Sequence, residues 1–147
     1  MICDKIACCK EVVNHSKKTL VDRKGGKSKY SINNKSQSKY SIINFEDCVY
    51  EGKQNETKCD FGIEVNNSIY YVELKGSDVK KGIEQLLSTL NESENCFRGL
   101  TKKARLIVSK FPKPDLVKKT KEYKDLVKKT GSIENTIITQ NIYTEII

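Results

Sequence analysis

Residues 59–76 have the sequence CDFGIEVNNSIYYVELKG, and this segment decides the fold. Two stretches rich in β-branched and aromatic residues, 59–65 and 69–75, flank Asn66-Asn67-Ser68, which is typical of a tight turn. The segment is therefore predicted to be an antiparallel β-hairpin. If Asn66 and Asn67 form a two-residue turn, Asp60 lies directly opposite Glu73, with Cβ atoms about 4.5–5.5 Å apart.

The two faces of this hairpin have different compositions. Side chains alternate along a strand, so Glu73 and Lys75 share one face with Asp60. The opposite face is wholly apolar and consists of Phe61, Ile63, Val65, Tyr70, Val72 and Leu74. We therefore expect one face to join a core and the other to present two carboxylates and a lysine. A three-residue turn over 66–68 is the alternative, and it would place Asp60 opposite Leu74 instead.

Facing carboxylates indicate a cation site, because they repel each other unless a proton or a cation joins them. Mg²⁺ takes oxygen ligands of this kind and often binds substrate phosphates as well. A neighbouring lysine can orient or deprotonate a water, or stabilise charge on phosphate. Asp60 and Glu73 are therefore predicted to hold Mg²⁺, with Mn²⁺ as a substitute, and Lys75 to be the catalytic base or charge stabiliser.

The competing interpretation is an ordinary surface hairpin with a Glu–Lys pair. An acid two residues before a lysine occurs six times in the chain, so the triplet alone is not informative. Only Glu73-Leu74-Lys75 ends an apolar strand that follows a second strand carrying an acid. This context favours the cation site.

Hydrophobic periodicity and turn signals predict the remaining elements. They are a helix over 2–15, a basic loop or mobile hairpin at about 17–40, a strand over 41–50, a polar loop over 51–58, a helix capped by Ser77 or Asp78, a strand over 104–110, a helix over 115–130 and one or two strands within 133–147. No domain boundary is visible. The order predicts one α/β (α+β) domain over 1–147, with a central mixed β-sheet flanked by helices.

The charge of the chain favours an anionic partner. The 147 residues include 27 basic and 19 acidic residues, for a net charge of +8. All basic residues but Arg23, Arg98 and Arg105 are lysines, which suit phosphates rather than base edges. We expect nucleic acid, bound mainly through its phosphate backbone. The lysine-rich face of 115–130 supplies the candidate substrate-binding residues Lys118, Lys121, Lys124 and Lys128.

The chain shows no sign of membrane association or secretion. No apolar run approaches the about 20 residues of a spanning helix, and no apolar signal segment is visible at Met1. A cytoplasmic protein without a membrane partner is expected. Because the cytosol is reducing, the six cysteines are expected to be small buried hydrophobic residues rather than disulfides. A metal cluster of Cys8, Cys9, Cys48 and Cys59 is the alternative.

Asp60, Glu73-Leu74-Lys75 and the element order over about residues 2–110 resemble the PD-(D/E)xK nuclease superfamily, most closely small bacterial and phage-type members. That family has a restriction-endonuclease-like α-β-β-β-α-β core with an acid on the second strand and (D/E)-x-K on the third. Cys59 stands where the family name has proline.

The resemblance implies a Mg²⁺-dependent endonuclease, with DNA a more common substrate than RNA. The size and charge of the chain also suit a structure-selective mode of action. It also implies that Glu11 on the first helix, or Asp47 on the first strand, joins the metal shell, and that Gln85 lies near the site. The second hypothesis is a catalytically inactive module of this fold that binds nucleic acid or a protein partner. A homodimer is compatible with the size and charge of the chain, but the sequence does not fix the oligomeric state.

Overall fold

The computed structural model describes residues 2–22, 25–52 and 57–147. Its strands are β1 (Lys10–Val13), β2 (Lys17–Val21), β3 (Lys29–Asn33), β4 (Tyr40–Asn44), β5 (Phe61–Val65), β6 (Ser68–Lys75), β7 (Thr101–Val108), β8 (Thr136–Gln140) and β9 (Ile142–Ile146). Its helices are α1 (Ile2–Cys8), the π-helix η1 (Phe45–Val49), α2 (Val79–Ser93), the 3-10 helix η2 (Glu94–Phe97), α3 (Pro114–Val117) and α4 (Lys121–Thr130).

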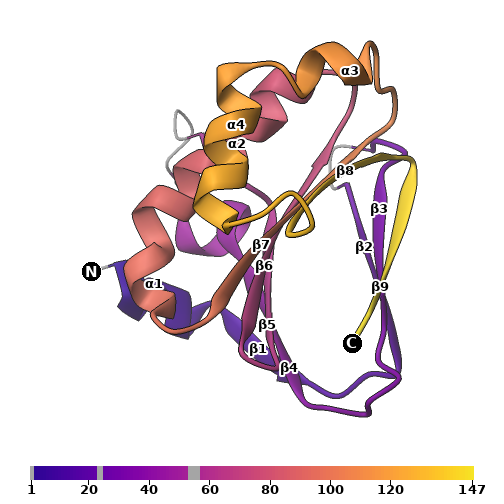
Figure 1. Cartoon of the computed structure of the whole chain (residues 1–147). Helices are drawn as coiled ribbons and strands as arrows, with labels where there is room; N and C mark the ends of the chain where they lie inside the picture. The colour runs from indigo at the N-terminus through magenta and orange to yellow at the C-terminus, as the bar shows by residue number, and fades with distance from the viewer. Residues whose placement is uncertain (1, 23–24, 53–56) are drawn as a thin grey trace.

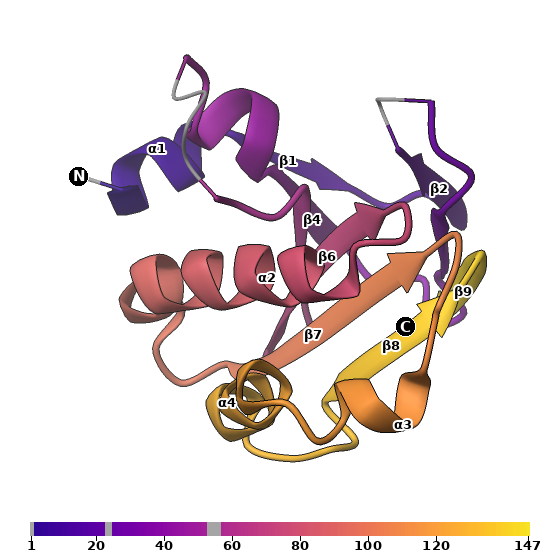
Figure 2. The same cartoon turned by 90° about the horizontal axis from the view of Figure 1, so that it is seen from above.

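The described elements form three layers (Figures 1 and 2). A six-stranded mixed sheet with the order β1-β4-β5-β6-β7-β8 lies in the middle. Helices α2 and α4 cover one of its faces, and a three-stranded sheet with the order β2-β3-β9 covers the other. Strands β4, β5 and β6 are antiparallel neighbours, whereas β6, β7 and β8 are parallel. The expected α/β class with a central mixed sheet is confirmed.

The two-residue turn of the β5–β6 hairpin is confirmed. Asn66 and Asn67 have φ values of 49° and 63°, as the commonest tight hairpin turn requires. The strands pair Val65 with Ser68 and Phe61 with Val72. Continued by one residue, this register places Asp60 opposite Glu73 and excludes the three-residue turn.

Strand β6 lies between two hydrophobic cores. Its Tyr70, Val72 and Leu74 pack with the apolar face of β5 under the second sheet, as predicted. The sequence had suggested that the other face is open. It is instead covered, because Ile69 and Tyr71 are buried on the helix side. Helix α2 has an apolar stripe of its own, and packing that stripe against β6 and β7 buries both surfaces. The face becomes polar only at its end, from Glu73 onward.

Three sequence predictions of element bounds are wrong in part. The helix expected over 2–15 ends at Cys8, and Lys10–Val13 instead pair with β4. The strand expected over 41–50 ends at Asn44, whose side-chain Oδ1 accepts a hydrogen bond from the Asp47 amide and starts η1. The helix expected over 115–130 is interrupted at Thr120, which is extended and caps α4.

Other predictions are confirmed. Asp78 caps α2, since its side chain accepts from the Lys81 amide at 3.0 Å. The basic segment at 17–40 contains the hairpin of β2 and β3, and β9 joins it as a parallel neighbour of β3 to complete the second sheet. The loop expected over 51–58 falls partly on residues 53–56, outside the described residues.

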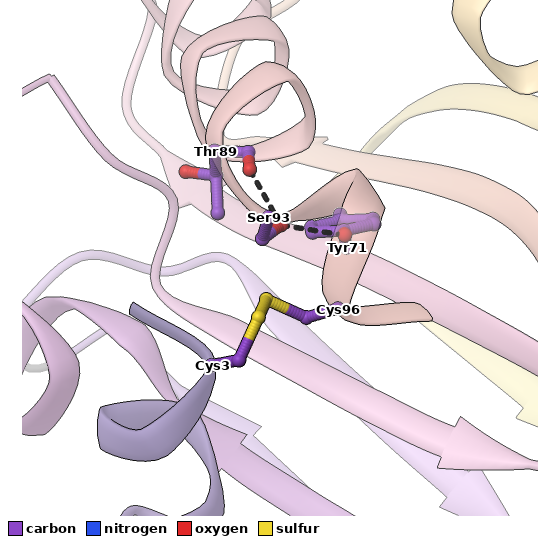
Figure 3. The surroundings of a disulfide bond; sticks show 5 residues. All are labelled: Cys3, Tyr71, Thr89, Ser93 and Cys96. Atoms are coloured by element: carbon purple, nitrogen blue, oxygen red, sulfur yellow. Dashed lines mark hydrogen bonds between the residues drawn. A yellow bond between two sulfur atoms is a disulfide. The ribbon is translucent and has the colours of Figure 1, made fainter. Parts of the chain in front are cut away.

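The expectation that the cysteines are buried hydrophobic residues is wrong for five of the six, because four form disulfides and Cys8 is exposed. Cys3 is bonded to Cys96, and Cys9 to Cys48. Figure 3 shows the first disulfide beside Tyr71, Thr89 and Ser93. Cys8 is an exposed thiol and Cys59 a buried one. Since Cys9 and Cys48 are joined to each other, the alternative cluster of four metal-binding thiols is also wrong.

A buried ion pair joins the two sheets. Arg105 of β7 and Glu145 of β9 are 4% and 7% exposed, and the Arg105 Nε donates to Glu145 Oε1 at 2.7 Å. The Tyr30 hydroxyl donates to the same oxygen at 2.8 Å. Burial of this hydroxyl, together with the Glu145 charge, raises the pKa of Tyr30 well above its ordinary value. Arg105 and Glu145 each stabilise the charge of the other, because burying an unpaired charge costs free energy.

We expect Arg105→Met to lower the free energy of unfolding by about 3–5 kcal/mol, because it leaves the Glu145 carboxylate buried without its cation. The double variant Arg105→Met/Glu145→Leu is expected to recover much of that loss. Urea unfolding measures both. Lys129→Met is the control, since it breaks the more exposed Lys129–Glu94 pair (3.2 Å) and should cost less than about 1 kcal/mol. Equal losses in the single and double Arg105 variants would contradict the expectation.

Candidate active site

The polar end of β6 opens into a pocket of about 270 Å³. The pocket lies where β6 ends, between η1 and the start of α2, and residue Asp22 reaches it from the end of β2. Its lining contains five carboxylates and one cationic side chain: Asp22, Glu46, Asp47, Asp60, Glu73, Leu74, Lys75, Gly76 and Gln85. All three residues of the predicted motif therefore line one concave site.

Asp60 and Glu73 are held by each other's strands. The Asp60 amide donates to Glu73 Oε1 at 3.0 Å, and the Leu74 amide donates to Asp60 Oδ2 at 2.9 Å. These reciprocal bonds continue the hairpin beyond its last regular pair and orient both carboxyl groups. Such backbone donors also compensate part of the cost of removing a carboxylate from water.

The environment of Asp60 favours its protonated form. Burial, a hydrogen bond to the Glu46 side chain and the Glu46 charge together raise the pKa of Asp60 to about 8, against the opposing effect of the Leu74 amide. A hydrogen bond between two carboxyl groups requires a shared proton. This contact therefore favours a proton between Asp60 and Glu46, a role that a bound cation can also fill.

Glu73 is the deepest acid in the site, with only 2% of its surface exposed. Burial raises its pKa well above the ordinary value, and the neighbouring Asp60 raises it further, whereas the Lys75 ammonium lowers it. Lys75 is half-buried at the pocket, and its carbonyl accepts from the Ser28 hydroxyl at 2.8 Å. This hydrogen bond joins the second sheet directly to β6, the strand that carries Glu73 and Lys75.

Gln85 lies in the pocket as the family resemblance implied. Its Nε2 donates to the Lys58 carbonyl at 3.1 Å, which fixes the amide. Its Oε1 is shielded from solvent and has no hydrogen-bond partner in the described part of the chain. A buried acceptor of this kind suits a donor that enters the site, such as a water molecule on a cation.

The structure separates the two proposed sources of an additional acid. Asp47 lines the pocket, but it lies on η1 rather than on the predicted strand. Glu11 is exposed on edge strand β1, opposite Ile42, and is not among the lining residues. The first helix ends before Glu11 because residues 10–13 pair with β4, so the implied contribution of a first-helix acid is not available here.

Sequence reasoning missed Asp22 and Glu46. Asp22 comes from the second sheet, and only the packing of the two sheets brings it to β6. Glu46 was visible as the neighbour of Asp47, but its contact with Asp60 depends on the turn of η1 after Asn44. The Asn44 cap is the one local signal that could have indicated this turn.

The predicted substrate-binding lysines are spread along α3 and α4. Lys80 in the first turn of α2 lies 3.9 Å from Glu122 in the first turn of α4. Helix α4 therefore starts beside the start of α2, which is the end of α2 nearest to the pocket. Lys118 and Lys121 are exposed at this end. Lys128 is farther along, beside Leu87 and Asn91 in the second half of α2.

The donors in the pocket match the chemistry of a hard divalent cation. Asp60 and Glu73 supply carboxylate oxygens, and Gln85 supplies an amide oxygen, which are ligands that Mg²⁺ and Mn²⁺ accept. Within residues 2–22, 25–52 and 57–147, no group of three or more His, Cys, Asp or Glu side chains is already gathered in a geometry that could hold a metal ion. A cation here would use a small protein ligand set and retain water, as Mg²⁺ commonly does.

Comparisons of the chain with protein-family models, with curated proteins and with solved structures find no match. No helix in the described part of the chain is long and apolar enough to cross a membrane.

The raised pKa of Asp60 predicts the pH dependence of stability. The pKa of Asp60 is about 8 in the folded protein and about 3.8 ordinarily. Between these two pH values, the folded protein retains a proton that the unfolded chain has already released. This contribution is complete at low pH and is lost as the pH rises through about 8. We therefore expect the melting temperature of the metal-free protein to fall between about pH 5 and pH 8, and Asp60→Asn to flatten that decline.

Thermal unfolding in a chelating buffer measures this effect. Asp125→Asn, which changes an exposed carboxyl group on α4, serves as the control and should keep the wild-type slope. The same slope in Asp60→Asn as in the wild type would contradict a protonated Asp60.

Proposed function

We propose that this protein is a Mg²⁺-dependent nuclease that hydrolyses phosphodiester bonds of nucleic acid, with DNA favoured over RNA. One observation carries the proposal. Asp60, Glu73 and Lys75, selected from sequence geometry, converge on a single pocket, and reciprocal hydrogen bonds orient both acids. A surface hairpin with an ordinary Glu–Lys pair would have no reason to bury Glu73 in this way.

The order of elements supports the same proposal. Helix α1, strands β4, β5 and β6, helix α2 and strand β7 follow one another as α-β-β-β-α-β, with β1, β2 and β3 inserted after α1. Asp60 directly precedes the second strand of this series, and Glu73 and Lys75 end the third. This is the arrangement that the resemblance to the PD-(D/E)xK superfamily implies.

Four of the pocket residues have distinct roles in the proposed reaction. Asp60 and Glu73 would hold Mg²⁺, which supplies Lewis-acid activation of the phosphate and of water. Lys75 shares the strand face of Glu73 and would orient the attacking water or stabilise negative charge on the phosphate. Gln85 offers Oε1 as an acceptor at the edge of the site.

The surface of the protein supports binding through phosphates. Among the aromatic side chains in the described residues, only Phe111 and Tyr143 are even partly exposed, so few platforms are available on which bases could stack. In the described part of the chain, the exposed cations near the pocket are lysines, which bind the backbone as point charges. A homodimer and a protein partner stay predictions, as does a cytoplasmic location. The disulfides would be unusual in the cytoplasm, because such bonds are rare in a reducing cytosol.

We expect the wild type to cleave plasmid or oligonucleotide DNA in Mg²⁺ or Mn²⁺ and to be inactive in a chelator. Glu73→Gln and Lys75→Met should each lower the rate by about a hundredfold or more, because each removes charge needed in the transition state. Glu134→Gln is the control, since Glu134 is an exposed acid outside the pocket. Gel-based cleavage of plasmid, single-stranded, branched and RNA substrates gives the rates.

Two results would overturn the nuclease proposal. One is absence of cleavage on all of these substrates, and the other is unchanged cleavage by Lys75→Met. Retained, salt-sensitive binding without cleavage would instead support the inactive binding module.

The lysines should contribute unequally to binding. Lys118 and Lys121 lie at the pocket end of α3 and α4, so Lys118→Ser/Lys121→Ser should reduce the slope of log affinity against log salt by about 2. Lys124→Ser/Lys128→Ser, matched in charge, should reduce it by less. Fluorescence anisotropy with a duplex in chelator measures both. A larger effect of the second variant would place the nucleic acid along the middle of α4.

A further inference from the structure

The structure assigns a regulatory role to the bond between Cys9 and Cys48. We propose that this disulfide is a redox switch that holds the acidic segment of η1 in the pocket, and that its reduction weakens cation binding there. The effect on cations rests on the proposed function, whereas the effect on the position of η1 does not.

The bond lies next to two residues of the site. Glu46 and Asp47 line the pocket, and Cys48 follows them directly on η1. Cys9, between α1 and β1, is the other end of the bond. The bond therefore links the acidic turn covalently to a separate part of the sheet. A π-helical turn is rare and is often found at functional sites.

The remaining contacts of η1 are non-covalent, and they include hydrogen bonds from the Glu46 amide to the Asp60 carbonyl at 3.4 Å and from the Asp47 amide to Asn44 Oδ1 at 3.1 Å. Phe45 is fully buried, and its amide donates to the Asp60 carbonyl at 3.0 Å. Val49 is 2% exposed at the other end. Glu46 and Asp47 lie between these two buried residues. Cys48, which is bonded to Cys9, directly follows Asp47. Once the bond is lost, non-covalent contacts alone would hold the acidic turn, so we expect the turn to move more.

The bond is accessible to a thiol. Cys48 is exposed, so a thiolate of a small dithiol can attack its Sγ, releasing the Cys9 thiolate and forming a mixed disulfide. The second thiol of the reductant then displaces the Cys48 sulfur. In total, two electrons and two protons pass from the dithiol to the protein, which gains two thiols while the reductant becomes a disulfide.

The second disulfide provides a matched control. Cys3–Cys96 joins α1 to η2, which follows the C-terminal end of α2, whereas the pocket lies at the start of α2. Its neighbours in Figure 3 are Tyr71, Thr89 and Ser93, none of which lines the pocket. Its loss should change stability without changing the acidic turn.

The test measures Mn²⁺ binding by calorimetry with the full chain, oxidised and after treatment with dithiothreitol. Reduction should weaken Mn²⁺ affinity by about tenfold, the scale on which outer groups of a metal site act. The variant Cys3→Ser/Cys96→Ser retains only the proposed switch and should respond as the wild type does. Cys9→Ser/Cys48→Ser should bind weakly under both conditions. An unchanged affinity on reduction of the first variant would overturn the effect on cations.

Hydrogen exchange separates the switch from the proposed function. In the metal-free protein, reduction should speed exchange of the amides of residues 45–49, in the wild type and in Cys3→Ser/Cys96→Ser. If Glu73→Gln leaves the Mn²⁺ affinity of the oxidised protein unchanged, the proposed metal site is wrong. The redox switch is then tested by hydrogen exchange alone. Exchange unchanged by reduction overturns the switch even if Cys9→Ser/Cys48→Ser does not fold.

Discussion

The register of β5 and β6 is the constraint on which the rest of the molecule depends. The turn at Asn66 and Asn67, both with positive φ, pairs Val65 with Ser68. A slip of one residue would exchange the two faces of a strand and move its apolar residues out of their core. Because β6 is buried on both faces, only one register satisfies both cores. That register also brings Asp60 opposite Glu73.

The site has a cost in stability that its surroundings partly offset. Two carboxyl groups are withdrawn from water, and their pKa values are raised because the charged forms lose hydration and repel each other. The amides of Asp60 and Leu74 restore some of the lost hydrogen bonding. Perturbed acids in a concave site are characteristic of functional centres. The arrangement therefore supports the proposed chemistry at the pocket.

The second sheet serves both architecture and site. Its β9 supplies Glu145 to the buried Arg105, which specifies how the two sheets pack. Its hairpin places Ser28 against the Lys75 carbonyl and brings Asp22 to the pocket. A change in the packing of the sheets would thus reach the acids directly. The Cys9–Cys48 bond constrains the opposite side of the same pocket, through η1.

By itself, the sequence determined the hairpin, its turn, its apolar face and the convergence of Asp60, Glu73 and Lys75, because strand alternation and turn chemistry act over a few residues. It also indicated the Asp78 cap and the position of Gln85. Only the tertiary structure decided that Glu11 lies outside the pocket, that Asp22 and Glu46 line it, and which cysteines pair. These outcomes depend on contacts between segments far apart in the chain. Contacts between distant segments form the disulfides and the packing of the two sheets. Local periodicity in the sequence carries no information about such contacts.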